Sequence, residues 1–158
     1  MMEKPENELK ILSFYDSEDK DHWLSEIKKC SWAAGKFLYE LVTEDRFKEL
    51  CGQSAKILLL TDGGHLASFC TYAEQDDVRA PEVTPWAGFV YTFPEYRGRH
   101  LMGKLLDKAY ELAKADGFEY LHISTGETGL YEKYGYTFWK FMKEWNGADS
   151  RIYRKRIE

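Results

Sequence analysis

The chain has 158 residues and a formal net charge of −5 at pH 7, and 44% of its residues are hydrophobic. That length fits one domain with a substantial core, and the apolar content excludes a disordered chain. The longest strongly apolar run, residues 57–60, is far too short to cross a bilayer, and the charged start, residues 1–6, lacks the apolar segment of a signal peptide. We therefore expect one cytoplasmic domain over residues 1–158 that binds neither a membrane nor, given its negative charge, nucleic acid.

The charge is unevenly divided along the chain. Residues 1–96 hold 10 basic and 18 acidic residues, a net charge of −8, whereas residues 97–158 hold 12 and 9, a net charge of +3. An asymmetry between the two halves indicates that they contact partners of different charge.

Neither the histidines nor the cysteines are spaced as metal ligands. The four histidines are scattered, and Cys30, Cys51 and Cys70 lie far apart without a paired C-x-x-C spacing. We therefore expect no metal site, and three free, mostly packed thiols of the kind usual in a reducing compartment.

The first third of the chain is predicted to be mainly helical. Residues 9–15 are predicted to form a short strand, and a helix follows over about 18–30 with its apolar residues at helical spacing. A second helix is predicted over about 35–51, where Asp45 is a residue able to interrupt it and Gly52 ends it.

The apolar period then changes to that of strands. Residues 56–61 and 66–73 form a predicted hairpin around the turn at residues 62–64. A polar loop over residues 76–85 separates this hairpin from a strand over residues 86–93, which is rich in aromatic side chains.

The last part of the chain alternates between helix and strand. Residues 101–115 have one apolar helical face, residues 119–125 form a strand, and residues 130–134 form a short helix. Residues 136–145 and 151–157 are predicted to be a final antiparallel pair.

This order of elements predicts an α+β fold. We expect a central mixed, mostly antiparallel sheet of about six to seven strands, flanked by about four helices. The strand-helix-strand unit over residues 86–125 is expected to be a right-handed crossover, which makes its two strands parallel neighbours.

The chemistry is concentrated in residues 93–104, which form a strand end, a basic turn and a helix start. Such a turn presents free backbone N–H groups and the positive end of the helix dipole, a combination suited to a phosphate or pyrophosphate. Arg97 and Arg99 add positive charge there, although an arginine at a helix start is equally often a solvated surface residue.

Two short motifs in the second half of the chain carry a family resemblance. The first is Pro-Glu-Tyr-Arg-Gly-Arg, residues 94–99, and the second is Tyr-Glu-Lys-Tyr-Gly-Tyr within residues 129–136. The first resembles the start of the acyl-CoA-binding motif, Arg/Gln-x-x-Gly-x-Gly/Ala, of the GNAT family of N-acetyltransferases, and the second is similar to that family's Tyr-Glu-Lys-x-Gly-Phe signature. The chain departs from the first motif, because His100 and Met102 stand at its two glycine positions and Gly103 comes one place late.

The resemblance implies a GNAT-like fold and acetyl-CoA as the acyl donor. The pantetheine arm would lie between the two parallel strands, bonded to backbone groups of the first strand, and the pyrophosphate would lie in the turn. The residues expected to bind the donor are Val90, Tyr91, Thr92, Arg97, Gly98, Arg99, His100, Leu101, Met102 and Gly103.

The resemblance also implies the catalytic groups. Tyr131 is the candidate general acid for the leaving thiolate, although a tyrosine merely packed among aromatic rings is the alternative. The general base is open among Asp76, Asp77, Glu82 and Glu127, each of which would ordinarily be a solvated loop carboxylate. We prefer Glu127, which follows a strand close in sequence to Tyr131.

Two functions from different classes remain. The first is an acetyl-CoA-dependent N-acetyltransferase acting on a primary amine of a small molecule or peptide. The second is a catalytically silent acyl-CoA-binding or sensing module on the same fold, motivated by His100 and Met102. The acidic first half favours a cationic acceptor, and the resemblance implies a possible homodimer.

Overall fold

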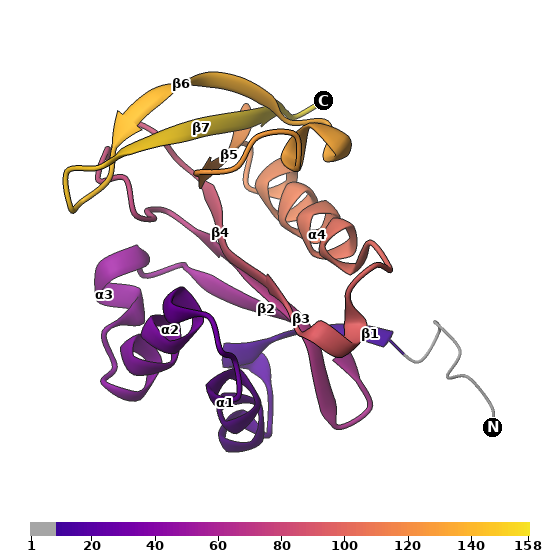
Figure 1. Ribbon diagram of the computed structural model, residues 1–158. Helices are drawn as coiled ribbons and strands as arrows, with labels where there is room; N and C mark the ends of the chain where they lie inside the picture. The colour runs from indigo at the N-terminus through magenta and orange to yellow at the C-terminus, as the bar shows by residue number, and fades with distance from the viewer. Residues whose placement is uncertain (1–8) are drawn as a thin grey trace.

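A seven-stranded sheet runs through the computed structural model, which describes residues 9–158 (Figure 1). The spatial order of its strands is β1-β2-β3-β4-β5-β7-β6, and only β4 and β5 are parallel neighbours. The strands are β1 (Leu9–Ser13), β2 (Lys56–Asp62), β3 (His65–Ala73), β4 (Trp86–Thr92), β5 (Tyr120–Thr125), β6 (Thr137–Lys143) and β7 (Asp149–Arg156). The predicted mixed, mostly antiparallel sheet is confirmed, whereas the charged start, residues 1–6, lies outside the described residues.

Helices cover both faces of the sheet. Figure 1 shows α1, α2 and α3 on one side of β2–β4 and α4 on the other. They span α1 (Lys20–Lys28), α2 (Ala33–Thr43), α3 (Phe47–Cys51) and α4 (Leu101–Ala115). The short 3₁₀ turns are η2 (Phe14–Asp16), η3 (Pro94–Tyr96) and η4 (Tyr131–Tyr134), of which η4 replaces the predicted short helix at 130–134.

The single helix predicted over residues 35–51 is wrong, because the structure has two helices there and the break lies at Asp45. Asp45 adopts a left-handed backbone with φ 57°, and the N–H of Arg46 bonds to the carbonyl oxygen of Leu41 at 2.7 Å. A left-handed residue ends a helix because it turns the chain away from the helical path, and aspartate tolerates this conformation better than most residues. The segment therefore folds as two helices, α2 and α3.

The alternation of side chains along β4 divides the core in two. Ala87 and Val90 pack in the cluster beneath α4, whereas Phe89 and Tyr91 pack with α1 and α2. Successive side chains of a β-strand point to opposite faces, as those of Phe89, Val90 and Tyr91 do. Ala87 and Phe89, two residues apart, also point to opposite faces, because the backbone is bulged at Phe89 with φ 48°. Helix α4 completes its layer with an apolar stripe: Leu101, Leu105, Leu106, Ala109 and Ala113.

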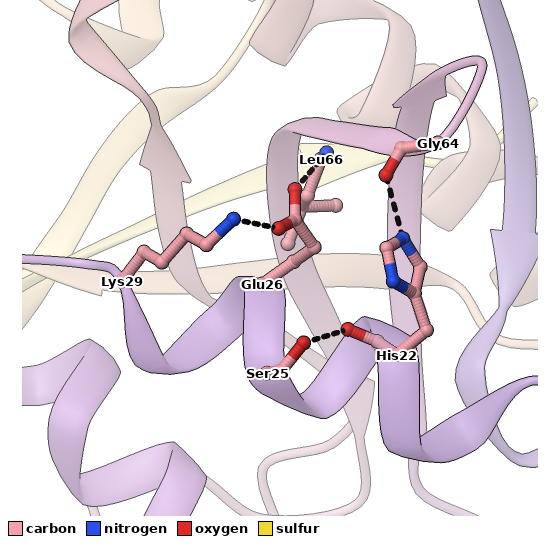
Figure 2. Close-up of polar contacts among 6 residues, drawn as sticks. All are labelled: His22, Ser25, Glu26, Lys29, Gly64 and Leu66. Atoms are coloured by element: carbon pink, nitrogen blue, oxygen red, sulfur yellow. Dashed lines mark hydrogen bonds and ion pairs between the residues drawn. The ribbon is translucent and has the colours of Figure 1, made fainter.

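The β2–β3 hairpin is tied to α1 by polar contacts (Figure 2). The buried carboxylate of Glu26 accepts a hydrogen bond from the Leu66 N–H at 3.0 Å and pairs with Lys29. Burial opposes ionisation of Glu26, but the Lys29 and Leu66 hydrogen bonds hold its pKa below the ordinary value. His22 Nε2 lies 2.6 Å from the carbonyl oxygen of Gly64 in the turn.

The sheet forks between β4 and β5. Among the described residues these strands share one register pair, Trp86 with His122. Beyond it β4 carries a bulge, with Phe89 at φ 48°, and neither Phe89 nor Val90 has a register partner in β3. The parallel crossover predicted over residues 86–125 is confirmed, and its strands diverge toward the start of α4 (Figure 1).

Candidate active site

The basic turn follows the open end of the fork. Arg97 folds back toward β4, where its Nε donates to the carbonyl oxygen of Thr92 at 2.9 Å and its guanidinium carbon lies 5.5 Å from the centre of the Tyr91 ring. The Arg99 guanidinium lies 5.9 Å from the Tyr96 ring centre. Both arginines are exposed, so their remaining N–H groups face solvent at the turn.

Helix α4 begins at a residue in the left-handed conformation. His100 precedes the helix with φ 55° and ψ 31°, and its side chain makes no capping hydrogen bond with the described part of the chain. Leu101 and Met102 are the first two helical residues, so their N–H groups have no acceptor within the helix. Gly98, at φ 83°, has nothing within 4 Å of an added Cβ, which leaves the turn open to an anion.

Gly103 lies on the packed side of α4. A Cβ built on it would come 2.8 Å from Cε1 of Tyr134, which belongs to η4. The missing side chain therefore lets η4 approach the helix, and η4 is the element that carries Tyr131. The glycine that comes late in the motif thus has a packing role on this face.

Two of the three β4 residues predicted to contact pantetheine already use their backbone carbonyl oxygens in hydrogen bonds. The carbonyl oxygen of Tyr91 accepts a hydrogen bond from Ser68 Oγ at 2.7 Å, and that of Thr92 accepts the Arg97 Nε. Val90, at the bulge, has no register partner among the described residues of either neighbouring strand. Of the three predicted pantetheine contacts, Val90 is therefore the one with the freest backbone.

Tyr131 and Glu127 follow β5, which forms the side of the fork opposite β4. Tyr131 is 8% exposed, with its ring centre 6.3 Å from that of Tyr136. Burial first, and then the charge of Glu127, raise the pKa of the Tyr131 hydroxyl well above its ordinary value. The phenol is therefore protonated at neutral pH, as a proton donor must be, whereas Glu127 is exposed to solvent.

The loop between β3 and β4 brings two neighbouring carboxylates to the fork. Oδ1 of Asp76 lies over Gly88 of β4, where an added Cβ would come within 2.1 Å of that oxygen. The side chain of Ser124 on β5 faces the Asp77 carboxylate and partly opposes the rise of its pKa, and Ser124 Oγ lies 2.7 Å from Ser150 Oγ. Gly88 and Ser124 each lie two residues beyond the single register pair that joins the strands. The two aspartates therefore bridge β4 and β5 where these strands separate.

Both aspartates are more buried than a polar loop predicts. Oδ1 of each is buried and makes no hydrogen bond with the described residues. Burial first, and then the charge of Asp77, raise the pKa of the Asp76 carboxyl to about 7, and burial also raises the pKa of Asp77. The prediction of solvated carboxylates is wrong for this pair because the loop folds back onto the sheet, and it is confirmed for Glu82 and Glu127, which are exposed.

An aromatic surface lies beside the pair. The N–H of Trp145, at the tip of the β6–β7 hairpin, donates to the carbonyl oxygen of Asp77 at 2.8 Å. The Trp145 ring is 68% exposed and stacks on Phe37 of α2 at 6.2 Å, and Phe37 in turn lies 6.5 Å from Phe89 of β4. Burial and then the charge of Asp77 raise the pKa of Glu144 as well. Carboxylates and aromatic faces are the groups that bind organic cations.

A cavity of about 380 Å³ lies between α1 and the end of β4. The ion pair of Glu26 and Lys29 in Figure 2 forms part of its wall. The cavity adjoins the basic turn at Glu95 and Tyr96, so it belongs to the same end of the fork. Its lining residues are Glu26, Lys29, Ser31, His65, Leu66, Tyr91, Phe93, Pro94, Glu95 and Tyr96.

The cysteines, the possible metal ligands and the helix lengths can each be described for residues 9–158. Cys30, Cys51 and Cys70 are free and buried, as predicted. Within residues 9–158, no three metal-ligating side chains of His, Cys, Asp or Glu gather in one place. No helix in this part of the chain has the length and apolar content needed to span a bilayer.

Solved structures with the same fold are distant in sequence. An acetyltransferase from Streptococcus agalactiae is 18% identical and aligns over 94% of this chain and 98% of its own, with a TM-score of 0.64. An acyl-CoA N-acyltransferase from Pseudomonas aeruginosa is 18% identical over 93% and 97%, with a TM-score of 0.62. An aminoglycoside 6′-acetyltransferase type Ii is 14% identical over 95% and 97%, with a TM-score of 0.68. No curated protein matches the chain.

The family is decided by the sequence match. The model of the acetyltransferase (GNAT) family matches residues 17–136, which include α1 to α4, the fork, the basic turn and Tyr131. The matched region is most of the chain, and the whole fold agrees with that of the solved acetyltransferases. The chain therefore belongs to the acetyltransferase (GNAT) family.

Proposed function

We propose that this protein transfers the acetyl group of acetyl-CoA directly to a primary amine of a small molecule or peptide, in the cytoplasm. The observation that carries the proposal is the fork between β4 and β5, which has a basic turn at its open end and a buried tyrosine beyond β5. A direct transfer needs the thioester, the amine and the proton donor held together, and a donor bound in the fork would lie near both Tyr131 and the acceptor amine.

The donor would bind along the fork with its pyrophosphate at the basic turn. The first-turn N–H groups of α4 and the exposed guanidinium groups of Arg97 and Arg99 suit its negative charge. The pantetheine amides would bond to the backbone at Val90, which has no register partner in β3, and the contacts predicted for the other residues of the turn remain proposals of the same kind.

Tyr131 is proposed to protonate the leaving thiolate of CoA. Its burial supports this role, because the hydroxyl stays protonated at neutral pH and still carries its proton when the carbon–sulfur bond breaks. Glu127 remains the carboxylate predicted from the family resemblance, placed after β5 where its charge acts on Tyr131.

Calorimetry with acetyl-CoA, followed by a free-thiol assay against a panel of primary amines, tests this function. We expect acetyl-CoA to bind and thiol release to depend on an amine. Binding without turnover of any amine would instead favour the silent acyl-CoA-binding module, which His100 and Met102 at the glycine positions of the motif motivate. Absence of donor binding would contradict both functions.

We also propose that the protein pairs with a second copy through β6. This strand is at the edge of the sheet, and Phe138 and Phe141 on it are 46% and 54% exposed with their ring centres 5.3 Å apart. Exposed apolar rings on an edge strand with unpaired backbone groups are a common site of association.

A further inference from the structure

The Asp76–Asp77 pair lies against both arms of the fork at the point where β4 and β5 separate. Asp76 contacts β4 at Gly88, and Asp77 faces Ser124 on β5, both immediately beyond the point where the strands separate. An acyl donor lying in the fork would therefore bring its thioester close to these carboxylates. Glu127, by comparison, is exposed beyond the end of β5.

Burying the carboxylates of Asp76 and Asp77 costs free energy unless a ligand supplies hydrogen-bond donors to them. A buried carboxylate oxygen without a hydrogen-bond donor loses its hydration and gains nothing in return. Asp76 and Asp77 each carry such an oxygen, and the adjoining glycine leaves room for the Asp76 carboxyl against the strand. An ammonium group has three N–H donors and a positive charge, so it satisfies both oxygens and reduces the repulsion between the two carboxylates.

We propose that Asp76 is the general base of the acetyl transfer and that the acceptor amine arrives as an ammonium ion held by Asp76 and Asp77. This inference rests on the proposed function and assigns its base and the charge of its acceptor. It assigns the base to Asp76 in place of Glu127. The aromatic surface of Phe37 and Trp145 then faces the organic part of the acceptor.

The protons and bonds of the reaction balance with these groups. The ammonium gives one proton to the Asp76 carboxylate, and the freed nitrogen lone pair forms a bond to the thioester carbon. The carbon–sulfur bond breaks, and the Tyr131 hydroxyl gives its proton to the leaving thiolate. The second proton of the attacking nitrogen restores the Tyr131 hydroxyl, and Asp76 releases its proton to solvent.

The charges around Asp76 agree with this role. Burial first, and then Asp77, raise its pKa to about 7, which suits a base that works near neutral pH. Arg79, an exposed cation of the same loop, lowers that pKa only in part. The titratable and charged groups that face Asp76 from the elements around it are Asp77, Arg79, Glu144, Cys51 and Tyr131.

The pH profile of kcat/KM tests the assignment. For the wild-type protein with a primary amine acceptor, we expect kcat/KM to rise with pH and level off above a pKa near neutrality. In Asp76→Asn we expect roughly a 100-fold loss at pH 7. The near-neutral pKa should disappear, and the remaining rate should follow the fraction of free amine up to alkaline pH. The acetyl-CoA Kd should stay within about twofold, which a misfolded variant would not retain.

Three further variants make the result decisive. Gly88→Ala pushes a methyl group against the Asp76 carboxyl and should cause a similar loss without removing the acid. Glu111→Gln, an exposed carboxylate on α4, removes the same charge at a distance and should keep the wild-type profile. If Glu127→Gln loses the near-neutral pKa while Asp76→Asn keeps it, the base is Glu127 and the proposal is wrong.

The two proposals fail in different ways. An active wild-type protein whose profile is unchanged in Asp76→Asn refutes the assignment of Asp76 alone. A wild-type protein that binds acetyl-CoA but acetylates no amine refutes the proposed function, and the role of Asp76 with it.

Discussion

Among single residues, Tyr131 has the most specific proposed role, that of proton donor to the leaving thiolate. Tyr131→Phe removes the proposed proton donor but keeps the buried ring, so kcat should fall roughly 100-fold while the acetyl-CoA Kd changes little. Steady-state kinetics and calorimetry measure the two quantities. Tyr136→Phe is the matched control, because the Tyr136 hydroxyl is buried and makes no hydrogen bond with the described residues. Equal losses in both variants would indicate a packing effect.

The burial of Asp76 also makes stability depend on pH. Its carboxyl has a higher pKa in the folded protein than the ordinary 3.8, so the folded state binds this proton more tightly than the unfolded state does. Stability is therefore full below the unfolded pKa and falls as the pH rises from about 4 through about 7. Asp76→Asn removes that fall, so its Tm at pH 8 should exceed that of the wild type by about 2–6 °C.

Thermal unfolding followed by circular dichroism at pH 8 and pH 4 checks this linkage. At pH 4 the wild-type carboxyl is largely protonated in the folded state and about half protonated in the unfolded state, so the two Tm values should converge. A difference of the same size at both pH values would mean that the substitution acts through packing rather than through the charge of the carboxylate.

At the scale of elements, the start of α4 combines a strained residue with the proposed binding site of the donor. His100 holds a left-handed backbone that costs a non-glycine residue about 1 kcal/mol or more. His100→Gly should therefore raise the unfolding free energy by about 0.5–1 kcal/mol, and urea unfolding measures it. Lys104→Gly, inside the same helix, is the control and should lower it by about 1 kcal/mol. A loss of stability in His100→Gly would reveal a stabilising contact of the imidazole.

The basic turn before α4 is expected to hold the donor by charge. Replacing Arg97 and Arg99 together by Ala should weaken the acetyl-CoA Kd roughly 10- to 100-fold, because each arginine can give a charge-assisted hydrogen bond to the pyrophosphate. Isothermal calorimetry measures the change. Replacing Lys108 and Lys114 by Ala removes the same charge further along the helix and should leave the Kd nearly unchanged. Equal weakening in both pairs would indicate a long-range field instead.

For the whole molecule, the proposed pairing of two copies depends on the exposed face of β6. Phe141→Lys places a charge on that face and should shift a homodimer to the monomer, because the surface that pairs would have to bury an unpaired ammonium. Light scattering at several protein concentrations measures the mass. A wild-type protein that is monomeric at every concentration would refute the proposed pairing.

Most elements of the fold follow from local patterns. The apolar face over residues 101–115, the hairpin around residues 62–64 and the basic turn at Arg97 were all readable, because each depends on side chains close in sequence. The break in the predicted helix at Asp45 depends on one residue's backbone conformation, which a period of apolar residues does not specify. Motif spacing also indicated which residues lie along the fork.

The two loop aspartates were the part of the site that local patterns misjudged. Asp76 and Asp77 look like any polar loop, and the signals that mark them are a glycine within β4 and a serine near the end of β5. Those residues are separated from the pair by ten or more positions, so only the folded chain places them in contact.

The amino-acid sequence by itself determined most of the order of helices and strands, the place of the basic turn before α4 and the family. These properties arise from hydrogen bonds and apolar spacing between near neighbours. The tertiary structure alone decided which carboxylates lose their water, because burial and the repulsion between Asp76, Asp77 and Glu144 depend on segments brought together across the fork.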